Sequence, residues 1–396
     1  MLAIKILFWF FLFIIFYAYV GYGLLLFIII KIKRLLSKPA RVSREQCYEP
    51  EVTLFCTAYN ERNYVEKKMD NSLSLEYPAH KLKHLWVTDG SDDGTPEILK
   101  KYAEVQVQHQ DERAGKVAAM NRGMKFVNTP LVIFSDGNTL LGKESVRRIV
   151  NLFQDPIVGC VSGEKRVLQK EKDSAVATEG FYWKYESKLK QWDSELYSVV
   201  GAAGELFAIR TELFRPVEND TILDDFIISL EIAKRGYTVK YDPEAYAIET
   251  ASADIKNELK RKVRIAAGGI QSIVRLKELL NIFRYGVLSF QYISHRVLRW
   301  TLAPMGLLVI FILNFLIAFS NEYQIFTGIY FWLFAGQALF YLAAFAGWFF
   351  ENRKIKIKVL FIPYYFLIMN IAVYLGFFRY IKGGQSVKWE KAKRGM

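Results

Sequence analysis

An α/β domain is indicated first by the stretch His84-Leu-Trp-Val-Thr-Asp-Gly-Ser-Asp-Asp-Gly-Thr95, in which a short apolar run ends in an acidic turn with two glycines. A helical pattern follows this turn, and the same order recurs from residue 51 and from residue 131. Strands that alternate with helices are typical of an α/β fold with a largely parallel sheet. Because ligands bind at the carboxyl ends of such strands, we expect the functional site on these acidic turns.

The alternation extends on both sides of this stretch. Predicted strands cover residues 51–57, 84–89, 104–108, 131–135 and 157–162. Predicted helices cover residues 61–75, 95–102 and 116–127. The pattern contains no internal repeat, so a single α/β domain is expected here.

Four apolar blocks predict membrane crossings. Residues 6–30, 300–321, 323–350 and 359–378 contain no Asp, Glu, Lys or Arg. A helix needs about 20 apolar residues to cross the hydrocarbon core of a bilayer. The alternative, buried helices of a soluble protein, is disfavoured because four such blocks are hard to cover with protein alone. The first block runs into Lys31 rather than a cleavage site, which indicates a retained anchor.

Positive charge gathers beside these blocks. The chain carries 53 Lys+Arg against 40 Asp+Glu, a formal net charge of +13. The basic and aromatic segment 256–300 is typical of interfacial helices on anionic lipid, with a solvated face of the domain as the alternative. We expect membrane lipids as partners of these cations, and no nucleic acid.

The cations also predict a topology. Segments 31–38 and 351–358 are cation-rich and are expected in the cytosol together with the α/β domain. We therefore expect a multi-pass protein of the plasma membrane with its α/β domain facing the cytosol. The basic tail favours the same side, which requires that one block be re-entrant or interfacial. Residues 359–378, with Pro363 near their start, are the candidate, and the sequence leaves the number of crossings open.

These patterns divide the chain into five parts. We expect a transmembrane anchor at 1–37, an α/β domain at 45–280, an interfacial amphipathic helix at 281–299, a transmembrane region at 300–381 and a basic tail at 382–396.

Two strand-end turns carry residues suited to a nucleotide. Thr57-Ala-Tyr-Asn-Glu61 closes the first predicted strand, and Asp89-Gly-Ser-Asp-Asp-Gly-Thr95 closes the second. A carboxylate accepts hydrogen bonds from base or ribose, an aromatic ring packs on a base, and glycine admits close backbone approach. The second turn is equally a good helix start, with an acidic or Ser cap and Pro96 early in the helix. Alone, neither turn establishes a nucleotide site.

Two further motifs suit a diphosphate and a metal ion. Arg113-Ala-Gly-Lys116 lies at a predicted helix start, where cations and N–H groups attract phosphate, although a solvated basic helix end is the alternative. The apolar strand at 131–135 ends in Asp136-Gly-Asn138. These oxygens suit Mg²⁺ or Mn²⁺, and a simple turn is again the alternative.

An acidic pair opens a later predicted helix. Asp224 and Asp225 follow the apolar residues Ile222 and Leu223. Carboxylates at a helix start can cap the helix, or one of them can act as a general base that takes the proton of an attacking hydroxyl. On this motif alone, capping is the simpler interpretation.

In this order, the motifs resemble glycosyltransferase family 2. The family consists of inverting, metal-dependent enzymes with a GT-A fold, a Rossmann-like domain that binds nucleotide-diphosphate sugars. The resemblance covers residues 51–271, and the flanking helices resemble the membrane-integrated branch with cellulose, hyaluronan and poly-N-acetylglucosamine synthases. It implies an α/β GT-A domain with transmembrane and interfacial helices, a UDP-sugar donor and a Mg²⁺ or Mn²⁺ cofactor.

The resemblance also implies roles for individual residues. The expected donor-binding residues are Thr57, Tyr59, Glu61, Asp89, Arg113, Lys116 and Asp136. The expected metal ligands are Asp136 and Asn138. The expected catalytic residues are Asp225 as general base, Asp224 beside it, and Arg264 opposite the leaving diphosphate. The segment Gly201-Ala-Ala-Gly-Glu205 resembles the loop along the acceptor channel.

Two positions depart from the family pattern. Asn138 stands where many members have a second Asp, which predicts weaker or more phosphate-dependent metal binding. The Gln-x-x-Arg-Trp motif of the processive branch reads Arg261-Lys-Val-Arg264-Ile265, so the cation is kept while the Gln and Trp are replaced. Processive polymerisation and single transfer therefore both stay open.

The expected function is inverting transfer of a sugar, more often GlcNAc or glucose in this family, from UDP to a polysaccharide or lipid-linked acceptor. The alternative is a non-enzymatic subunit that senses a nucleotide or sugar for an exopolysaccharide secretion complex, and a partner subunit is compatible with either. The amides Asn314, Gln337 and Asn370 in the apolar blocks suit a polymer path or simple interhelical hydrogen bonds.

Overall fold

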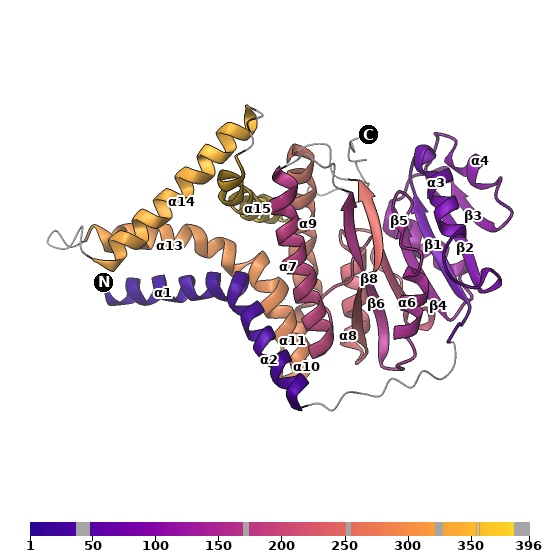
Figure 1. The fold of residues 1–396 in the computed structure, drawn as a ribbon, viewed down its shortest axis with the longest axis horizontal. Coiled ribbons are helices and arrows are strands. Elements are labelled where there is room, and N and C mark those ends of the chain that lie inside the picture. The colour runs from indigo at the N-terminus through magenta and orange to yellow at the C-terminus, as the bar shows by residue number, and fades with distance from the viewer. Residues whose placement is uncertain are drawn as a thin grey trace.

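The computed structural model describes residues 1–36, 48–168, 174–250, 255–320, 328–353, 355 and 357–383. An α/β domain lies at one end of the molecule and a group of long helices at the other (Figure 1). Most of the predicted basic tail, residues 384–396, lies outside the described residues.

One eight-stranded sheet forms the centre of the α/β domain, with the order β3-β2-β1-β4-β7-β6-β8-β5. The strands are β1 (Val52–Ala58), β2 (Leu82–Asp89), β3 (Val105–Gln110), β4 (Leu131–Asp136), β5 (Leu140–Leu141), β6 (Val158–Leu168), β7 (Leu206–Arg210) and β8 (Thr238–Thr250). Strands β1 to β4 pair in parallel, whereas β7 runs antiparallel to β4 and β6. The parallel α/β arrangement predicted from the alternating pattern is thus present, and β5, β7 and β8 are strands that the pattern did not predict.

Helices cover both faces of this sheet. They are α3 (Arg62–Leu73), α4 (Thr95–Leu99), α5 (Lys116–Gly123), α6 (Ser145–Leu152), α7 (Ser174–Leu196), α8 (Asp224–Lys234) and α9 (Ile255–Arg275). Alternate side chains of β1 enter two different apolar cores, because successive residues of a strand point to opposite faces. Phe55 packs in the core with Ile227 and Leu230 of α8, and Leu54 packs in the core with Val65 of α3 and Ile149 of α6.

The membrane region is built from four long helical segments. They are the continuous run of α1 (Leu2–Phe16), η1 (Tyr17–Gly21) and α2 (Tyr22–Leu36), followed by α13 (Leu302–Ala318), α14 (Ile329–Asn352) and α15 (Lys358–Ile381). By length and composition, three helices in the described residues can cross a membrane. A fourth span arises if α13 is counted together with the helix Val287–Trp300, from which it bends by 51°.

The three amides in the apolar helices make interhelical hydrogen bonds. Asn314 on α13 bonds Gln337 on α14 at 2.9 Å. The Tyr19 hydroxyl donates to Asn370 on α15 at 2.6 Å. Of the two interpretations that the sequence allows, these contacts support hydrogen bonds between helices, and they give no evidence of a polymer path.

The segment before α13 is helical but broken into α10 (Ile282–Tyr285), α11 (Val287–Tyr292), the π-helix η6 (Ile293–Val297) and α12 (Leu298–Trp300). Its arginines do not all face lipid as the basic pattern predicts. Arg296 and Arg299 instead pair with the buried Glu186 of α7, at 2.9 and 3.0 Å. These two arginines therefore compensate the charge of buried Glu186 and do not face lipid, while the interfacial position of the segment stays a prediction.

A buried polar cluster joins this segment to the N-terminal anchor. Asp193 of α7 accepts from the Tyr22 hydroxyl at 2.5 Å and lies 2.6 Å from Nδ1 of His295. The other imidazole nitrogen of His295 lies 3.1 Å from Glu186. All four side chains are less than 5% exposed, so the anchor is locked onto the α/β domain by contacts that exclude water.

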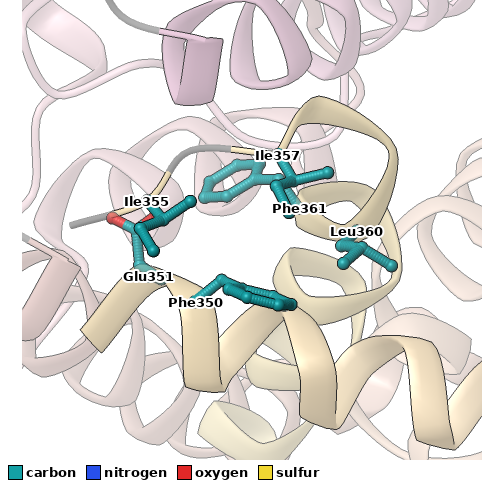
Figure 2. A pocket seen from close by; sticks show the side chains of 7 residues that line it. Phe350, Glu351, Ile355, Ile357, Leu360 and Phe361 are labelled. Atoms are coloured by element: carbon teal, nitrogen blue, oxygen red, sulfur yellow. The ribbon is translucent and has the colours of Figure 1, made fainter. Parts of the chain in front are cut away.

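A small pocket lies where α14 turns into α15. Figure 2 shows its apolar lining with Glu351 among the aromatic and aliphatic side chains. The lining residues are Gly347, Phe350, Glu351, Ile355, Ile357, Leu360 and Phe361. None of them belongs to the acidic turns of the sheet, so this pocket is separate from the candidate site.

Candidate active site

The carboxyl ends of β1, β2 and β4 meet at one edge of the sheet. Thr57 of β1 pairs with Asp136 of β4, and Ala58 pairs with Thr88 of β2. This register brings the turns after the three strands together, as the sequence predicts. The backbone carbonyl of Thr57 accepts a hydrogen bond from the amide of Gly137 at 3.3 Å, which joins the first turn to the third.

Asp89 holds the next loop in place. Its carboxylate, 4% exposed, accepts hydrogen bonds from the backbone amides of Ala114 at 3.1 Å and Gly115 at 2.7 Å. Gly90 follows at φ +68°, and a Cβ there would lie 2.6 Å from the Cβ of Arg113. The loop that leads into α5 is therefore clamped against the end of β2, a role that the sequence did not reveal.

Tyr59 and Arg113 come together over this edge. The guanidinium carbon of Arg113 lies 3.7 Å from the centre of the Tyr59 ring, within cation–π range. The Tyr59 turn is held by Asn60, which adopts φ 54° and exchanges hydrogen bonds of 2.8 and 3.0 Å with Asp92. The cation thus lies against the face of the Tyr59 ring, next to the loop that Asp89 holds.

Lys116 joins two acidic groups that are far apart in the sequence. It begins α5, and its ammonium donates to Asp136 at 2.9 Å and lies 3.5 Å from Asp224. Burial by itself would lower the pKa of Lys116, but the carboxylates of Asp136 and Asp224 outweigh it and raise that pKa. Burial also raises the pKa of Asp136, and the Lys116 charge opposes this effect. The lysine is therefore held as a cation.

Asp225 lies next to this group on the first turn of α8. Burial and the neighbouring carboxylate of Asp224 raise the pKa of Asp225 to about 7. The predicted acceptor loop lies against it, because a Cβ on Gly204 would be 3.0 Å from the Asp225 carboxylate. The same loop contacts the next residue, since Gly201 at φ +88° has room for no side chain beside Phe226.

The predicted metal ligands offer oxygen atoms in a suitable place. Asn138 donates from its amide nitrogen to Glu61 at 3.2 Å, while its buried Oδ1 has no hydrogen-bond partner in the described part of the chain. Asp136 lies two residues before it, and carboxylate and amide oxygens suit Mg²⁺ and Mn²⁺. No group of three His, Cys, Asp or Glu side chains in the described residues could hold a metal alone. The residues therefore fit a metal ion whose remaining ligands come from phosphate or water.

A second charged group borders the site and was not predicted from the sequence. Lys165 of β6 forms ion pairs with Glu205 of the acceptor loop and Glu249 of β8. Burial would raise the pKa of Glu205, but the Lys165 charge overcomes this and lowers the pKa to about 2. No local motif marks Lys165, because its partners come from other strands of the sheet.

Arg264 and Arg261 lie on α9 in different surroundings. Burial lowers the pKa of Arg264, and the carboxylates of Asp224, Asp225 and Asp136 are among the charges that act on it. Arg264 is thus close enough to these carboxylates to be influenced by their charges, and its role opposite the leaving diphosphate stays a prediction. Arg261, at the position of the family's Gln, instead pairs with Glu258 through two hydrogen bonds of 3.1 Å.

Comparison with known proteins gives a consistent result. The family described as "Glycosyltransferase like family 2" matches residues 50–268, which contain every site residue from Thr57 to Arg264. A poly-beta-1,6-N-acetyl-D-glucosamine synthase of Staphylococcus aureus (strain MSSA476) is 26% identical over 232 residues, 57% of this chain and 56% of the relative. The matched part thus spans little more than half the length of that relative. The synthase of Staphylococcus epidermidis is 24% identical over 379 residues, 87% of each chain.

A solved structure has the same fold. The mannosyltransferase PcManGT from Pyrobaculum calidifontis, solved in complex with GDP-Man and Mn²⁺, superposes with a TM-score of 0.69 at 22% identity. The match covers 92% of this chain and 96% of the other. The GT-A fold predicted from the motifs is confirmed, and the long helices beside the domain are part of the likeness.

Proposed function

Because this chain belongs to the glycosyltransferase-like family 2, we propose that it is an inverting membrane glycosyltransferase. It uses a UDP-sugar donor and transfers the sugar to a hydroxyl group of a glycan or lipid-linked acceptor. The single observation that carries this proposal is the contact of Lys116 with both Asp136 and Asp224. One cation thereby joins the expected donor-phosphate side of the site to the expected acceptor side.

Asp225 is the general base of the proposed reaction. A base with a pKa near 7 is about half ionised at neutral pH and is a stronger proton acceptor than an ordinary carboxylate. Asp225 accepts the proton of the acceptor hydroxyl while the hydroxyl oxygen bonds to the anomeric carbon of the donor sugar. The bond from that carbon to the phosphate oxygen breaks, and UDP leaves with the electron pair. A single displacement of this kind inverts the configuration at the anomeric carbon.

The charge of the leaving UDP is balanced by cations around Asp136. Lys116 and Arg264 are the chain's own cations there, and both are largely buried, which strengthens their electrostatic effect. A divalent ion, when held by Asp136 and Asn138, supplies further positive charge to the diphosphate. The uracil base packs beside Tyr59 and Arg113, and Asp89 holds the loop that carries Arg113.

The names of the relatives support N-acetylglucosamine as the donor sugar. The two Staphylococcus proteins are named as synthases of a poly-N-acetylglucosamine. We therefore prefer UDP-GlcNAc over UDP-glucose, and a polysaccharide over a lipid acceptor. Since UDP-sugars are cytosolic, the α/β domain faces the cytosol in this proposal, with the apolar helices in the plasma membrane.

The experiment that tests the function is UDP release by the detergent-purified full chain. UDP-GlcNAc, UDP-glucose and GDP-mannose are offered in turn with Mg²⁺ or Mn²⁺. Release with UDP-GlcNAc that disappears in Asp225→Asn, but not in the exposed control Asp70→Asn, is the expected result. Binding of UDP without release from any donor would contradict the proposal and would favour a nucleotide-sensing subunit.

A further inference from the structure

The ammonium of Lys116 contacts Asp136, one of the two residues expected to hold a divalent ion. The ammonium lies 2.9 Å from Asp136 and 3.5 Å from Asp224. The three side chains are only 12–13% exposed, so their charges interact with little screening by water. The positive charge that Asp136 needs in its buried position is therefore already supplied by the protein.

A divalent ion at Asp136 has to compete with the ammonium of Lys116. The other expected metal ligand, Asn138, does not offset this competition. Asn138 contributes a neutral oxygen, and its amide nitrogen is directed to Glu61 at 3.2 Å. The charges of Asp136 and Lys116 cancel, Asp224 lies 3.5 Å from the same ammonium, and the described residues contain no group of three His, Cys, Asp or Glu side chains that could hold a metal. A hard divalent cation gains little by entering such a site, because it needs several oxygen ligands and negative charge.

We propose that Lys116 is the resident counter-cation of the donor-free site, so that the divalent metal binds only together with the nucleotide diphosphate. The diphosphate brings oxygen ligands and negative charge in addition to those of Asp136 and Asn138. The diphosphate oxygens can also bind the ammonium of Lys116 once its contact with Asp136 is broken. This inference rests on the proposed function, since it assumes a diphosphate donor.

Metal and nucleotide must then strengthen each other's binding by the same factor, because linkage between two equilibria is reciprocal. The test measures Mn²⁺ binding to the full detergent-purified chain by electron paramagnetic resonance, with and without UDP. In the wild type we expect Mn²⁺ to bind at least about tenfold more tightly with UDP than without. Equal Mn²⁺ affinity in both conditions would overturn the proposal.

Removing the ammonium should open the site to metal alone. In Lys116→Gln we expect the Mn²⁺ affinity without UDP to rise by about tenfold. Addition of UDP should then increase the Mn²⁺ affinity less than it does in the wild type. Lys125→Gln removes an exposed lysine from the end of the same helical segment and should change neither value. The double variant Lys116→Gln/Asp136→Asn should lose the increase of about tenfold in Mn²⁺ affinity measured without UDP. This loss would locate the ion at Asp136.

Unchanged donor-free Mn²⁺ affinity in a folded Lys116→Gln protein would also overturn the proposal, with folding checked by thermal unfolding. Lys116→Arg keeps the positive charge and should keep the dependence on UDP. None of these readouts depends on sugar transfer. A protein that shows the coupling but releases no UDP from any donor would therefore refute the proposed function and leave this inference standing.

Discussion

At the scale of single residues, the site is organised by charges that the surrounding protein modifies. Burial and the charge of Asp224 raise the pKa of Asp225 to about 7. The pKa of Glu205 is lowered to about 2, because the charge of Lys165 outweighs the effect of burial. Two carboxylates beside the same loop thus differ in their readiness to accept a proton. This difference supports the proposal that Asp225, and not Glu205, is the general base.

Substitution of the base should separate chemistry from donor binding. Asp225→Asn is expected to abolish transfer while UDP affinity stays within about threefold, because a general base acts on the acceptor. UDP release and isothermal titration of UDP measure the two effects. Retained turnover in this variant would refute the assignment of Asp225.

The pH dependence of the wild-type rate reports the same group. Asp225 must be ionised to accept a proton, so kcat/KM should rise with pH and level off above an inflection near pH 7. Initial rates of UDP release between pH 5 and 9 give the profile. An inflection near the ordinary pKa of Asp, close to pH 4, would show that the carboxylate is not perturbed as described.

The raised pKa of Asp225 also has a cost in stability. The folded state holds this proton more tightly than the unfolded chain, so the contribution of Asp225 is favourable below about pH 4 and is lost as pH rises to about 7. Asp225→Asn should therefore raise the melting temperature at pH 8 more than at pH 4.5. Thermal unfolding in detergent at both pH values measures the difference, and an equal shift at both would contradict it.

At the scale of elements, the loop between β3 and α5 depends on the end of β2. The loop carries Arg113 and leads directly into Lys116 at the start of α5, and two of its backbone amides are bound by Asp89. Residues at one strand end thus set the position of cations that come from another segment. Asp89 and Asp92 in the turn after β2 bind other parts of the protein. The acidic character of this turn therefore does not require that each carboxylate contact a ligand.

Loss of this clamp should weaken donor binding without abolishing the fold. Asp89→Ala leaves two backbone amides without their acceptor, and we expect UDP affinity to fall by about tenfold or more. Asp92→Ala, in the same turn but bonded to Asn60, is the matched control and should have a smaller effect. Titration of UDP into each variant tests this, and equal losses would show that Asp89 has no special role.

At the scale of the whole molecule, the α/β domain and the membrane helices are joined by a buried polar cluster. Asp193 accepts from Tyr22 of the anchor and from Gln291, and it contacts His295. Helix α15 adds a second connection, since Gly376 packs closely on Ala266 of α9. The domain that carries the acidic site is therefore joined to the apolar helices by buried contacts.

Breaking this cluster should destabilise the whole protein. Asp193→Ala leaves several buried donors without an acceptor, and we expect a loss of about 3 kcal/mol in unfolding free energy. Glu195→Gln alters a pair with the largely exposed Arg34 and should cost less than about 1 kcal/mol. Chemical unfolding in detergent compares the two, and similar losses would show that the cluster is not a structural connection.

Much of this protein is determined by the sequence alone. Apolar runs that end in acidic turns specify parallel strands and their ligand-binding edge, and uncharged blocks specify the long helices, because each pattern acts locally. Strands β7 and β8 escaped prediction since they lack such a turn, and β8 alternates apolar residues with Lys240, Asp242 and Glu244 around Pro243. The sequence also did not predict that Arg296 and Arg299 pair with buried Glu186.

Only the tertiary structure decided how the site residues are combined. The sequence names Lys116, Asp136 and Asp224 as separate motifs, but their shared contact depends on how α5, β4 and α8 pack. The clamp at Asp89 and the pair of Lys165 with Glu205 likewise join segments distant in the chain. Residue type and local pattern determine what each side chain can do, whereas packing determines which charges meet in a buried site, where their interaction is strongest.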